Sequence, residues 1–330
     1  MTVKNVVIVG CGNMGSWHLV SLLGLGEECR FQVVEPDGRS VEVARKRVRQ
    51  AVEAGAREAQ IEWLDDLGRV SGGADLAIIA TLATGRVRVM EELMSRGQRV
   101  FLVEKVVCQS EEEYARLVEW MRERGVRGWV NCTRRYCEFY QSVAEMLSDS
   151  DGPVVMNVKA GAIGLGCNAI HMIDLFGWLC GNGGEVRLGG EYVRGELLQN
   201  SRGRELCEFA GTLVGGTDRG DMLTVSFVPD GDGEVSVGIA NKDVRAAVNE
   251  ISGRGVVATR QGGWGYVERG FRIPYSSELT RVIAGEIFST GSCRLPRVEE
   301  LFAAHRELFS VFGGVMAGVL GERAELCPIT

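Results

Sequence analysis

The chain has 330 residues, more than one ordinary hydrophobic core holds, so we expect about two domains. Its apolar content of 45% is typical of a globular protein, and a net charge of −7 without a basic stripe argues against a nucleic-acid-binding surface. The apolar runs are shorter than the roughly 18 residues of a membrane span, and the start of the chain lacks the pattern of a secretory signal, so we expect a cytoplasmic protein.

The first element is an apolar β-branched run over residues 6–9, followed by Gly10-x-Gly12-x-x-Gly15 and a helical pattern. Gly10 permits a tight turn, Gly12 lets the backbone approach a pyrophosphate, and Gly15 lets the helix pack closely on the strand. Because unpaired N–H groups at a helix N-terminus attract anions, we expect the pyrophosphate at Asn13 and Met14. The stretch predicts a dinucleotide-binding strand, turn and helix.

A second apolar run over residues 31–34 ends in Glu35, about twenty residues after the last glycine of the turn. An acidic side chain there binds the adenosine ribose hydroxyls of NAD and repels a 2′-phosphate. NAD is therefore the predicted cofactor. Arg39 follows shortly afterwards and keeps NADP open, because an arginine can accommodate the extra phosphate.

Strand and helix patterns then alternate up to residue 131. Helices are expected over 41–54, 87–95 and 110–124, and strands over 61–64, 75–80, 99–104 and 126–131. This alternation predicts a doubly wound parallel sheet, so residues 1–132 are interpreted as a dinucleotide-binding Rossmann domain.

The pattern changes after residue 133. Helices are expected over 138–147 and 169–179, and two helices end the chain. Between them lie short strand-like runs at 154–159, 206–214, 223–228, 234–240, 245–251 and 256–260, separated by glycine-rich turns. Residues 133–330 are therefore predicted to form an α+β domain with a largely antiparallel open sheet, for substrate binding and oligomerisation. The overall fold class is α/β.

Ten cysteines and three histidines are scattered singly along the chain, and no Cys-x-x-Cys pair occurs. In a long cytosolic chain this spacing indicates reduced thiols packed as small hydrophobic side chains. We predict no metal site.

Several short motifs in the right order resemble the Gfo/Idh/MocA family of NAD(P)-dependent oxidoreductases, which act mostly on sugars, cyclitols and nucleotide sugars. The first turn with His18 resembles the family's first motif, Ala80-Thr81 its "ATP", and Glu104-Lys105-Val106 its "EKP". The helical stretch over residues 169–179, with His171, Asp174 and Trp178, resembles its "GxHxxDxxxWL". The order of elements also matches, so the resemblance covers essentially the whole chain.

The resemblance implies hydride transfer between a substrate carbon and the nicotinamide. Lys105 would bind the reacting oxygen, His171 would accept and return the hydroxyl proton, and Asp174, on the same helical face, would orient His171. Lys105 as a surface lysine and His171 as a core histidine are the structural alternatives. The cofactor-binding residues implied are Gly10, Gly12, Asn13, Met14, Gly15, Glu35, Thr81, Glu104 and Lys105.

The chain also departs from the family pattern. Cys167, followed by Asn168, stands where many sugar dehydrogenases of the family carry an aspartate, Val106 replaces the proline of "EKP", and Arg86 replaces a histidine. Substrate contacts are expected from Cys167, Asn168 and His171.

Three arginines suggest an acidic substrate. Arg86, Arg134 and Arg135 carry guanidinium forks that suit a carboxylate or phosphate, such as that of a sugar acid or nucleotide sugar. The alternative is that they are solvated or paired with local glutamates.

Two other functions stay open. The departures at Cys167, Val106 and Arg86 allow a catalytically silent dinucleotide-binding sensor or scaffold, and the same fold also allows imine or enone reduction, which needs a proton donor. We expect a small sugar-like substrate, no nucleic acid or membrane partner, and a homodimer or homotetramer formed through the C-terminal sheet.

Overall fold

The computed structural model describes residues 3–161, 164–181, 185–194, 198–199, 203, 205–228, 233–321 and 326–330. The chain divides into two compact units, and each is described by itself. The first unit consists of Met1–Cys108, Glu112–Asn131 and Pro274–Glu300. The second consists of Gln109–Glu111, Cys132–Ile273 and Leu301–Thr330.

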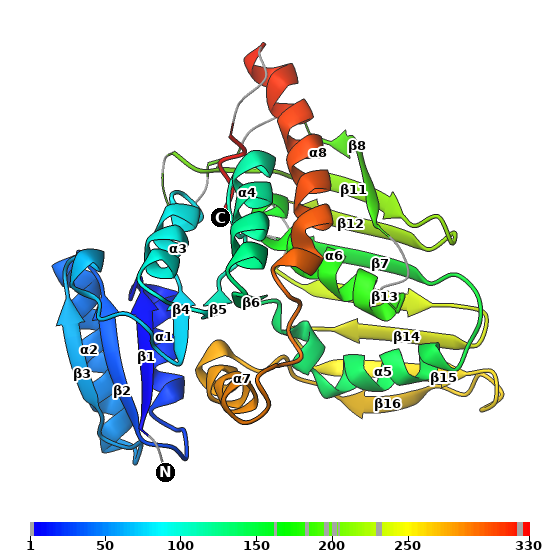
Figure 1. The fold of residues 1–330 in the computed structure, drawn as a ribbon. Coiled ribbons are helices and arrows are strands. Elements are labelled where there is room, and N and C mark those ends of the chain that lie inside the picture. Colours follow the sequence, from blue (N-terminus) through cyan, green and yellow to red (C-terminus); the bar gives the residue numbers. More distant parts are fainter. Residues whose placement is uncertain are drawn as a thin grey trace. The chain divides into compact units, whose positions relative to one another are not determined.

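The first unit is built on a six-stranded parallel sheet in the order β3-β2-β1-β4-β5-β6 (Figure 1). All four residues of β4 and the last four of β1 are buried, as expected for parallel strands that helices cover on both faces. This doubly wound order confirms the predicted Rossmann fold. The strands are β1 (Lys4–Val9), β2 (Cys29–Val34), β3 (Gln60–Leu64), β4 (Leu76–Ile79), β5 (Val100–Val103) and β6 (Arg127–Val130).

The helices of the first unit include one from late in the chain. They are α1 (Asn13–Leu22), α2 (Gly38–Glu53), α3 (Arg86–Ser95), α4 (Glu111–Glu123) and α7 (Ser276–Thr290), with 3-10 turns η1 (Leu67–Arg69) and η3 (Glu299–Leu301). Helix α7 packs on α1, where the Arg281 amide donates to Ser21 Oγ at 3.0 Å and Thr280 Oγ1 lies 2.8 Å from His18 Nδ1. Besides residues that precede the expected boundary at 132, the first unit therefore contains the later segment Pro274–Glu300.

The second unit contains an eight-stranded sheet in the order β16-β15-β14-β13-β7-β12-β11-β8 and a separate β9-β10 pair. Strands β7 and β12 are parallel and the other pairs of the large sheet are antiparallel, which confirms the predicted largely antiparallel sheet. The strands are β7 (Val155–Gly161), β8 (Arg187–Val193), β9 (Leu198–Gln199), β10 (Cys207–Glu208), β11 (Gly211–Gly216), β12 (Met222–Val228), β13 (Val235–Ala240), β14 (Val244–Asn249), β15 (Arg254–Thr259) and β16 (Val267–Gly270).

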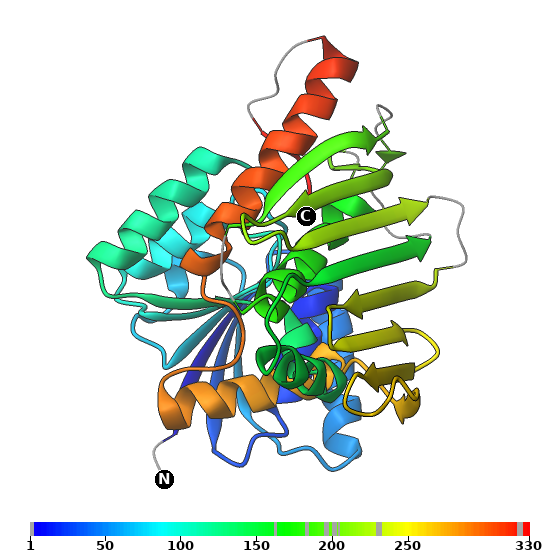
Figure 2. The ribbon, with the colours of Figure 1, turned by 90° about the vertical axis from the view of Figure 1, so that its right-hand side faces the viewer.

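Helices cover one face of the large sheet (Figures 1 and 2). They are α5 (Glu138–Ser148), α6 (Leu165–Leu179) and α8 (Phe302–Leu320), and the short turn η2 (Thr133–Tyr136) precedes them. Buried residues alternate with half-buried ones along β13, as expected for a sheet with one covered face. The core beneath the helices includes Phe209, which stacks on Phe312 of α8 with ring centroids 4.2 Å apart.

The uncovered face of this sheet is nearly flat and forms a shallow depression of about 830 Å³. Its lining combines small and apolar side chains with charged ones, of which Lys159 lies on the central strand β7 and Glu268 on the edge strand β16. The lining residues include Asn157, Lys159, Ser226, Gly238, Ala247, Arg254, Val256 and Glu268.

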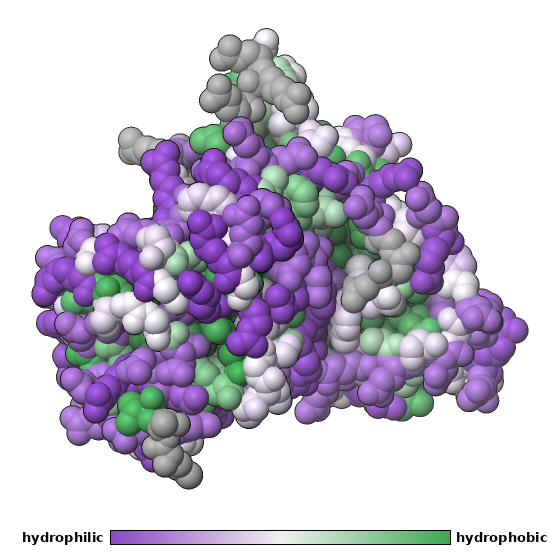
Figure 3. Space-filling view, viewed as in Figure 1, coloured by the Kyte–Doolittle hydropathy of each residue, from purple (hydrophilic) through white to green (hydrophobic). Residues whose placement is uncertain are grey.

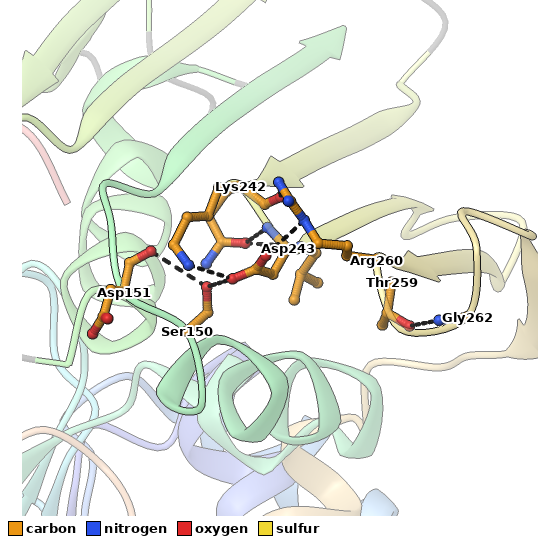
Figure 4. A network of polar contacts seen from close by, with 9 residues as sticks. Ser150, Asp151, Lys242, Asp243, Thr259, Arg260 and Gly262 are labelled. Carbon is orange, nitrogen blue, oxygen red and sulfur yellow. Dashed lines mark hydrogen bonds and ion pairs between the residues drawn. The ribbon is translucent and has the colours of Figure 1, made fainter.

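A polar network joins the turn between β13 and β14 to the segment after α5 (Figure 4). Asp243, in the turn between β13 and β14, binds Lys242 Nζ at 2.8 Å, Arg260 Nε at 3.0 Å and the Ser150 hydroxyl at 2.6 Å. These contacts lower the pKa of Asp243, chiefly through its hydrogen bonds from Lys242 and Ser150. The network therefore ties the turn after α5 to two strand ends and is structural.

Hydrophilic side chains predominate on the surface seen in Figure 3, with apolar residues in separate patches. Within the described ranges, no helix combines the length and the apolar character that crossing a membrane requires. None of the ten cysteines forms a disulfide. The described part of the chain contains no cluster of three or more His, Cys, Asp or Glu side chains suited to a metal ion.

Candidate functional site

The glycines of the first turn have distinct structural roles. Gly10 has φ +80°, and a Cβ there would lie 2.8 Å from the Thr81 amide nitrogen. A Cβ on Gly15 would lie 1.9 Å from the Gly10 carbonyl oxygen, whereas a Cβ on Gly12 would meet nothing within 4 Å. The fold therefore requires glycine at positions 10 and 15, while Gly12 borders open space.

The N-terminus of α1 is open to an anion. Gly12 is the N-cap residue, no side chain caps the helix, and the first turn contains no acidic residue. The N–H groups of Asn13, Met14 and Gly15 belong to this first turn, where orphan donors and the helix dipole favour negative charge. These residues fit the pyrophosphate of a dinucleotide.

Glu35, at the end of β2, lies against the same turn. Its carboxylate accepts the Cys11 amide at 2.7 Å and the Asp37 amide at 3.0 Å. Both bonds fix the acid next to the glycines, where a ribose-binding side chain is required. Arg39 is exposed nearby, so the geometry leaves both NAD and NADP open.

Arg47 of α2 also contacts this turn and was missed by the sequence analysis. Its guanidinium donates to the main-chain oxygen of Asn13 at 3.0 Å, to Asn13 Oδ1 at 3.0 Å and to Ser16 Oγ at 2.5 Å. It also lies over the Trp17 ring at 4.3 Å. Arg47 thereby fixes the Asn13 side chain, and its contact depends on helix packing rather than on any local motif.

The segment after β5 places Glu104 and Lys105 at the carboxyl end of the parallel sheet. Glu104 is 7% exposed, and its Oε1 lies 3.0 Å from His18 Nε2 and accepts Asn131 Nδ2 at 2.6 Å. Burial alone would raise the pKa of Glu104, but the hydrogen bonds and the charges of His18 and Lys105 lower it to about 2. Glu104 is thus a buried carboxylate next to Lys105, which is 7% exposed and precedes a cis peptide bond to Val106.

Arg86 holds the main chain of this segment from the other side. Its guanidinium is 1% exposed and donates to the carbonyl oxygen of Glu104 at 2.5 Å and to those of Val106 and Thr81. We expected Arg86 to face an acidic substrate. The contacts instead make it a buried brace between the ends of β4 and β5.

Thr81 carries an unsatisfied polar atom at the end of β4. Its Oγ1 is buried and has no hydrogen-bond partner within the described ranges. Buried hydroxyls are normally satisfied, so such an atom at this edge of the sheet fits a bound ligand. Thr81 supports the proposed dinucleotide site.

In the second unit, helix α6 carries His171 and Asp174. His171 is half-buried, and Asp174 is 3% exposed and accepts Arg135 Nη2 at 2.6 Å and Nε at 3.2 Å. We expected Asp174 to orient His171. Its carboxylate is held by the Arg135 guanidinium, which balances its buried charge.

Arg134 forms a second, largely buried ion pair. Its Nε and Nη2 donate to Glu250 at 2.8 and 2.6 Å, and the Tyr140 hydroxyl donates to the same carboxylate at 2.7 Å. Burial foremost raises the pKa of Tyr140, and the Glu250 charge raises it further. Both arginines are thus paired within the chain, although with acids distant in sequence, Glu250 and Asp174, rather than with local glutamates. Substrate binding by either arginine stays a prediction.

Cys167 and Asn168 lie in the first turn of α6, which begins at Leu165 rather than at the expected residue 169. The Cys167 amide donates to both carboxylate oxygens of Glu208, at 3.1 and 3.2 Å. The Asn168 side chain donates to the Gly164 carbonyl at 3.1 Å. Glu208 caps this helix from a distant strand, so no local signal marks the true start.

Residues 4–132 match a family described as oxidoreductases with an NAD-binding Rossmann fold. In sequence, the chain matches no curated protein.

Solved structures share the fold across both units. An oxidoreductase from Agrobacterium radiobacter, in complex with NAD+, L-tartaric acid and magnesium, is 12% identical, with 94% of each chain covered and a TM-score of 0.70. The UDP-N-acetylglucosamine 3-dehydrogenase GnnA from Acidithiobacillus ferrooxidans is 15% identical, with 98% of each chain covered and a TM-score of 0.66. The 3-ketoreductase KijD10 from Actinomadura kijaniata, in complex with TDP-benzene and NADP, is 14% identical, with 94% of this chain and 96% of that chain covered and a TM-score of 0.67.

Proposed function

We propose that the protein transfers a hydride between a nicotinamide and a hydroxyl or keto carbon of a sugar-like substrate. Residues 4–132 match the Gfo/Idh/MocA oxidoreductase family with its NAD-binding Rossmann fold, which supports the proposal. The observation that carries the proposal is the open first turn of α1, bordered by Gly12 and by the Glu35 carboxylate. The proposed cofactor is NAD, and the titration described below compares the affinity for NAD with that for NADP.

The chain's own residues provide the binding groups for this cofactor. The first turn of α1 would bind the pyrophosphate, Glu35 the adenosine ribose, and the Thr81 hydroxyl a polar group of the ligand. When bound, the nicotinamide supplies the hydride acceptor or donor. Glu104 and Lys105 follow β5 at the carboxyl end of the sheet, where ligands of doubly wound folds bind.

Lys105 and His171 would handle the substrate oxygen and its proton. The Lys105 ammonium would donate a hydrogen bond to the oxygen, which favours the negative charge that develops there during oxidation. The His171 imidazole would take the hydroxyl proton and return it in the reverse reaction. Asp174 would support this role through its place on α6, one turn from His171.

The proposed substrate is a sugar, sugar acid or nucleotide sugar. Two of the similar structures are named for reactions at the 3-position, one of them on a nucleotide sugar, and a third holds a hydroxy acid. Arg134 and Arg135 of η2 are already paired with acids of the chain, so they are no argument for an acidic substrate. The substrate screen should therefore contain neutral and acidic sugars alike.

The test is cofactor binding followed by turnover. Purified protein is titrated with NAD(H) and NADP(H), and nicotinamide absorbance is then followed with free sugars, sugar acids and nucleotide sugars. Turnover that is lost in Lys105→Met and His171→Asn, but kept in Lys46→Met on the exposed face of α2, supports the proposal. Tight cofactor binding without turnover on the whole panel would favour a sensor or scaffold instead.

A second copy of the chain is the proposed occupant of the uncovered sheet face. It presents apolar side chains such as Ala247 and Val256, while Lys159 and Glu268 supply charges of both signs for a two-fold interface. We expect Ala247→Arg to reduce the mass measured by light scattering, and Ala54→Arg on the first unit to leave it unchanged. A monomeric wild-type chain would overturn the proposal.

A further inference from the structure

His18 of α1 is completely buried and bonded at both ring nitrogens. Nδ1 lies 2.8 Å from Thr280 Oγ1 of α7, and Nε2 lies 3.0 Å from Glu104 Oε1. The proton positions on this ring follow from what each neighbour can offer.

Thr280 must accept the bond from Nδ1. A hydroxyl has one hydrogen, and that of Thr280 is directed at the Ser276 carbonyl oxygen, 2.7 Å away. If this hydrogen pointed at His18 instead, two oxygens would approach to 2.7 Å with no proton between them. The short contact therefore requires a proton on Nδ1.

Glu104 must also accept. Its Oε1 receives Asn131 Nδ2 at 2.6 Å, a bond that an ionised carboxylate accepts well. The charge of Lys105, the next residue in the chain, also lowers the pKa of Glu104 and favours the ionised carboxylate. An ionised carboxylate has no hydrogen to give, so Nε2 carries a proton as well.

We propose that His18 is a positioning residue that is protonated on both ring nitrogens and, as an imidazolium, holds the Glu104 carboxylate so that the Lys105 segment stays fixed. Two further contacts hold Glu104 in place. Asn131, in the loop after β6, donates to its carboxylate, and the Glu104 amide donates to the Ile79 carbonyl at 2.9 Å. The inference rests on the proposed function only for the catalytic use of Lys105. The charge state of His18 and its hold on Glu104 stand apart from it.

The charge state has a direct spectroscopic test. With only three histidines in the chain, the full-length protein labelled with ¹⁵N-histidine gives few ring signals, and His18→Gln assigns those of His18. We expect both His18 nitrogens to resonate as protonated nitrogens at neutral pH. One protonated and one unprotonated His18 nitrogen in the wild type would overturn the proposal.

A matched pair of threonine variants tests the donor argument. Thr280→Val removes the acceptor of Nδ1–H, so His18 should lose that proton and keep the one on Nε2, whereas Thr280→Ser should keep both. Thr290→Val makes the same change on α7 at an exposed threonine that also bonds the carbonyl four residues back, at 2.8 Å. It should leave the His18 signals in place, and a His18 ring that responds equally to Thr280→Val and Thr290→Val would refute the assignment.

The positioning role is tested by two readouts on His18→Phe and His18→Gln. Amide hydrogen exchange of residues 104–107 should become faster in both variants while α2 keeps its protection, and this measurement needs no substrate. If the wild type turns over a substrate, kcat should fall about a hundredfold, the usual effect of a small misplacement, with little change in KM. Unchanged exchange or an unchanged kcat would overturn the positioning role, whereas absence of wild-type turnover with faster exchange would count against the proposed function alone.

Discussion

Glu104→Gln should destabilise the first unit strongly at neutral pH and much less in acid. The substitution keeps the shape of the side chain and removes the charge that faces His18 and Asn131. The pKa of Glu104 is about 2 in the folded protein against 4.5 for an ordinary glutamate. At about 1.4 kcal/mol per pKa unit, the carboxylate contributes about 3 kcal/mol to the free energy of unfolding.

The sign of the pH dependence follows from the lowered pKa. A group with a lower pKa in the folded state contributes its full stability above its unfolded pKa, about 4.5, and loses it as the pH falls towards 2. The difference between wild type and Glu104→Gln should therefore be about 1 kcal/mol smaller at pH 3.5 than at pH 5.

The assay is urea unfolding followed by circular dichroism. Because two units can unfold separately, hydrogen exchange of peptides from residues 100–131 should accompany it. Glu58→Gln, the same change at an exposed position, is the control and should shift the free energy of unfolding by less than about 0.5 kcal/mol. A difference for Glu104→Gln below about 1 kcal/mol at pH 7, or one that persists unchanged at pH 3.5, would refute the reasoning.

Three further predictions concern other parts of the molecule. Gly12→Ala should fold normally but lose cofactor affinity in a fluorescence titration, whereas Gly15→Ala, whose Cβ would lie 1.9 Å from a carbonyl oxygen, should lower the melting temperature as well. Glu250→Gln should destabilise the second unit by about 3–5 kcal/mol in urea unfolding because it leaves Arg134 buried without its counter-charge, and Arg134→Met in the same chain should recover part of that loss. Burial, and secondarily the charge of Glu35, raises the pKa of the Cys11 thiol to about 12. Cys11 should therefore resist iodoacetamide at pH 8 in the folded protein and react once urea unfolds the chain, as measured by peptide mass spectrometry.

The first unit was largely predictable because its strands are buried on both faces and therefore stand out as apolar runs. The alternation of β4 and β5 with helices also fixed where Thr81 and Lys105 would lie, at the carboxyl ends of parallel strands. What the pattern could not show is that α7 joins this unit. That helix packs on α1, and its contacts, such as Thr280 to His18, join residues 262 positions apart.

The second unit was harder to predict in detail. Strand β16 is exposed at all four of its residues, so no alternation of apolar and polar side chains marks it. The expected strand over residues 206–214 is divided into β10 and β11, with Gly211 at φ +107° beginning the second part. Likewise, α6 starts four residues early because Glu208 caps it from a distant strand.

The arginines show why a sequence identifies a charged side chain more readily than the partner that the side chain binds. Arg134 and Arg135 are adjacent, yet one pairs with Glu250 of the β14 end and the other with Asp174 of α6. A guanidinium fork binds a carboxylate of its own chain with the same geometry as a carboxylate of a substrate. Because either partner would satisfy the same donors, only tertiary structure separates the two roles, and in this unit the partners are the chain's own buried acids. An anionic substrate would have to compete with a carboxylate already held at 2.6 Å, so its recognition should depend on other residues than these two.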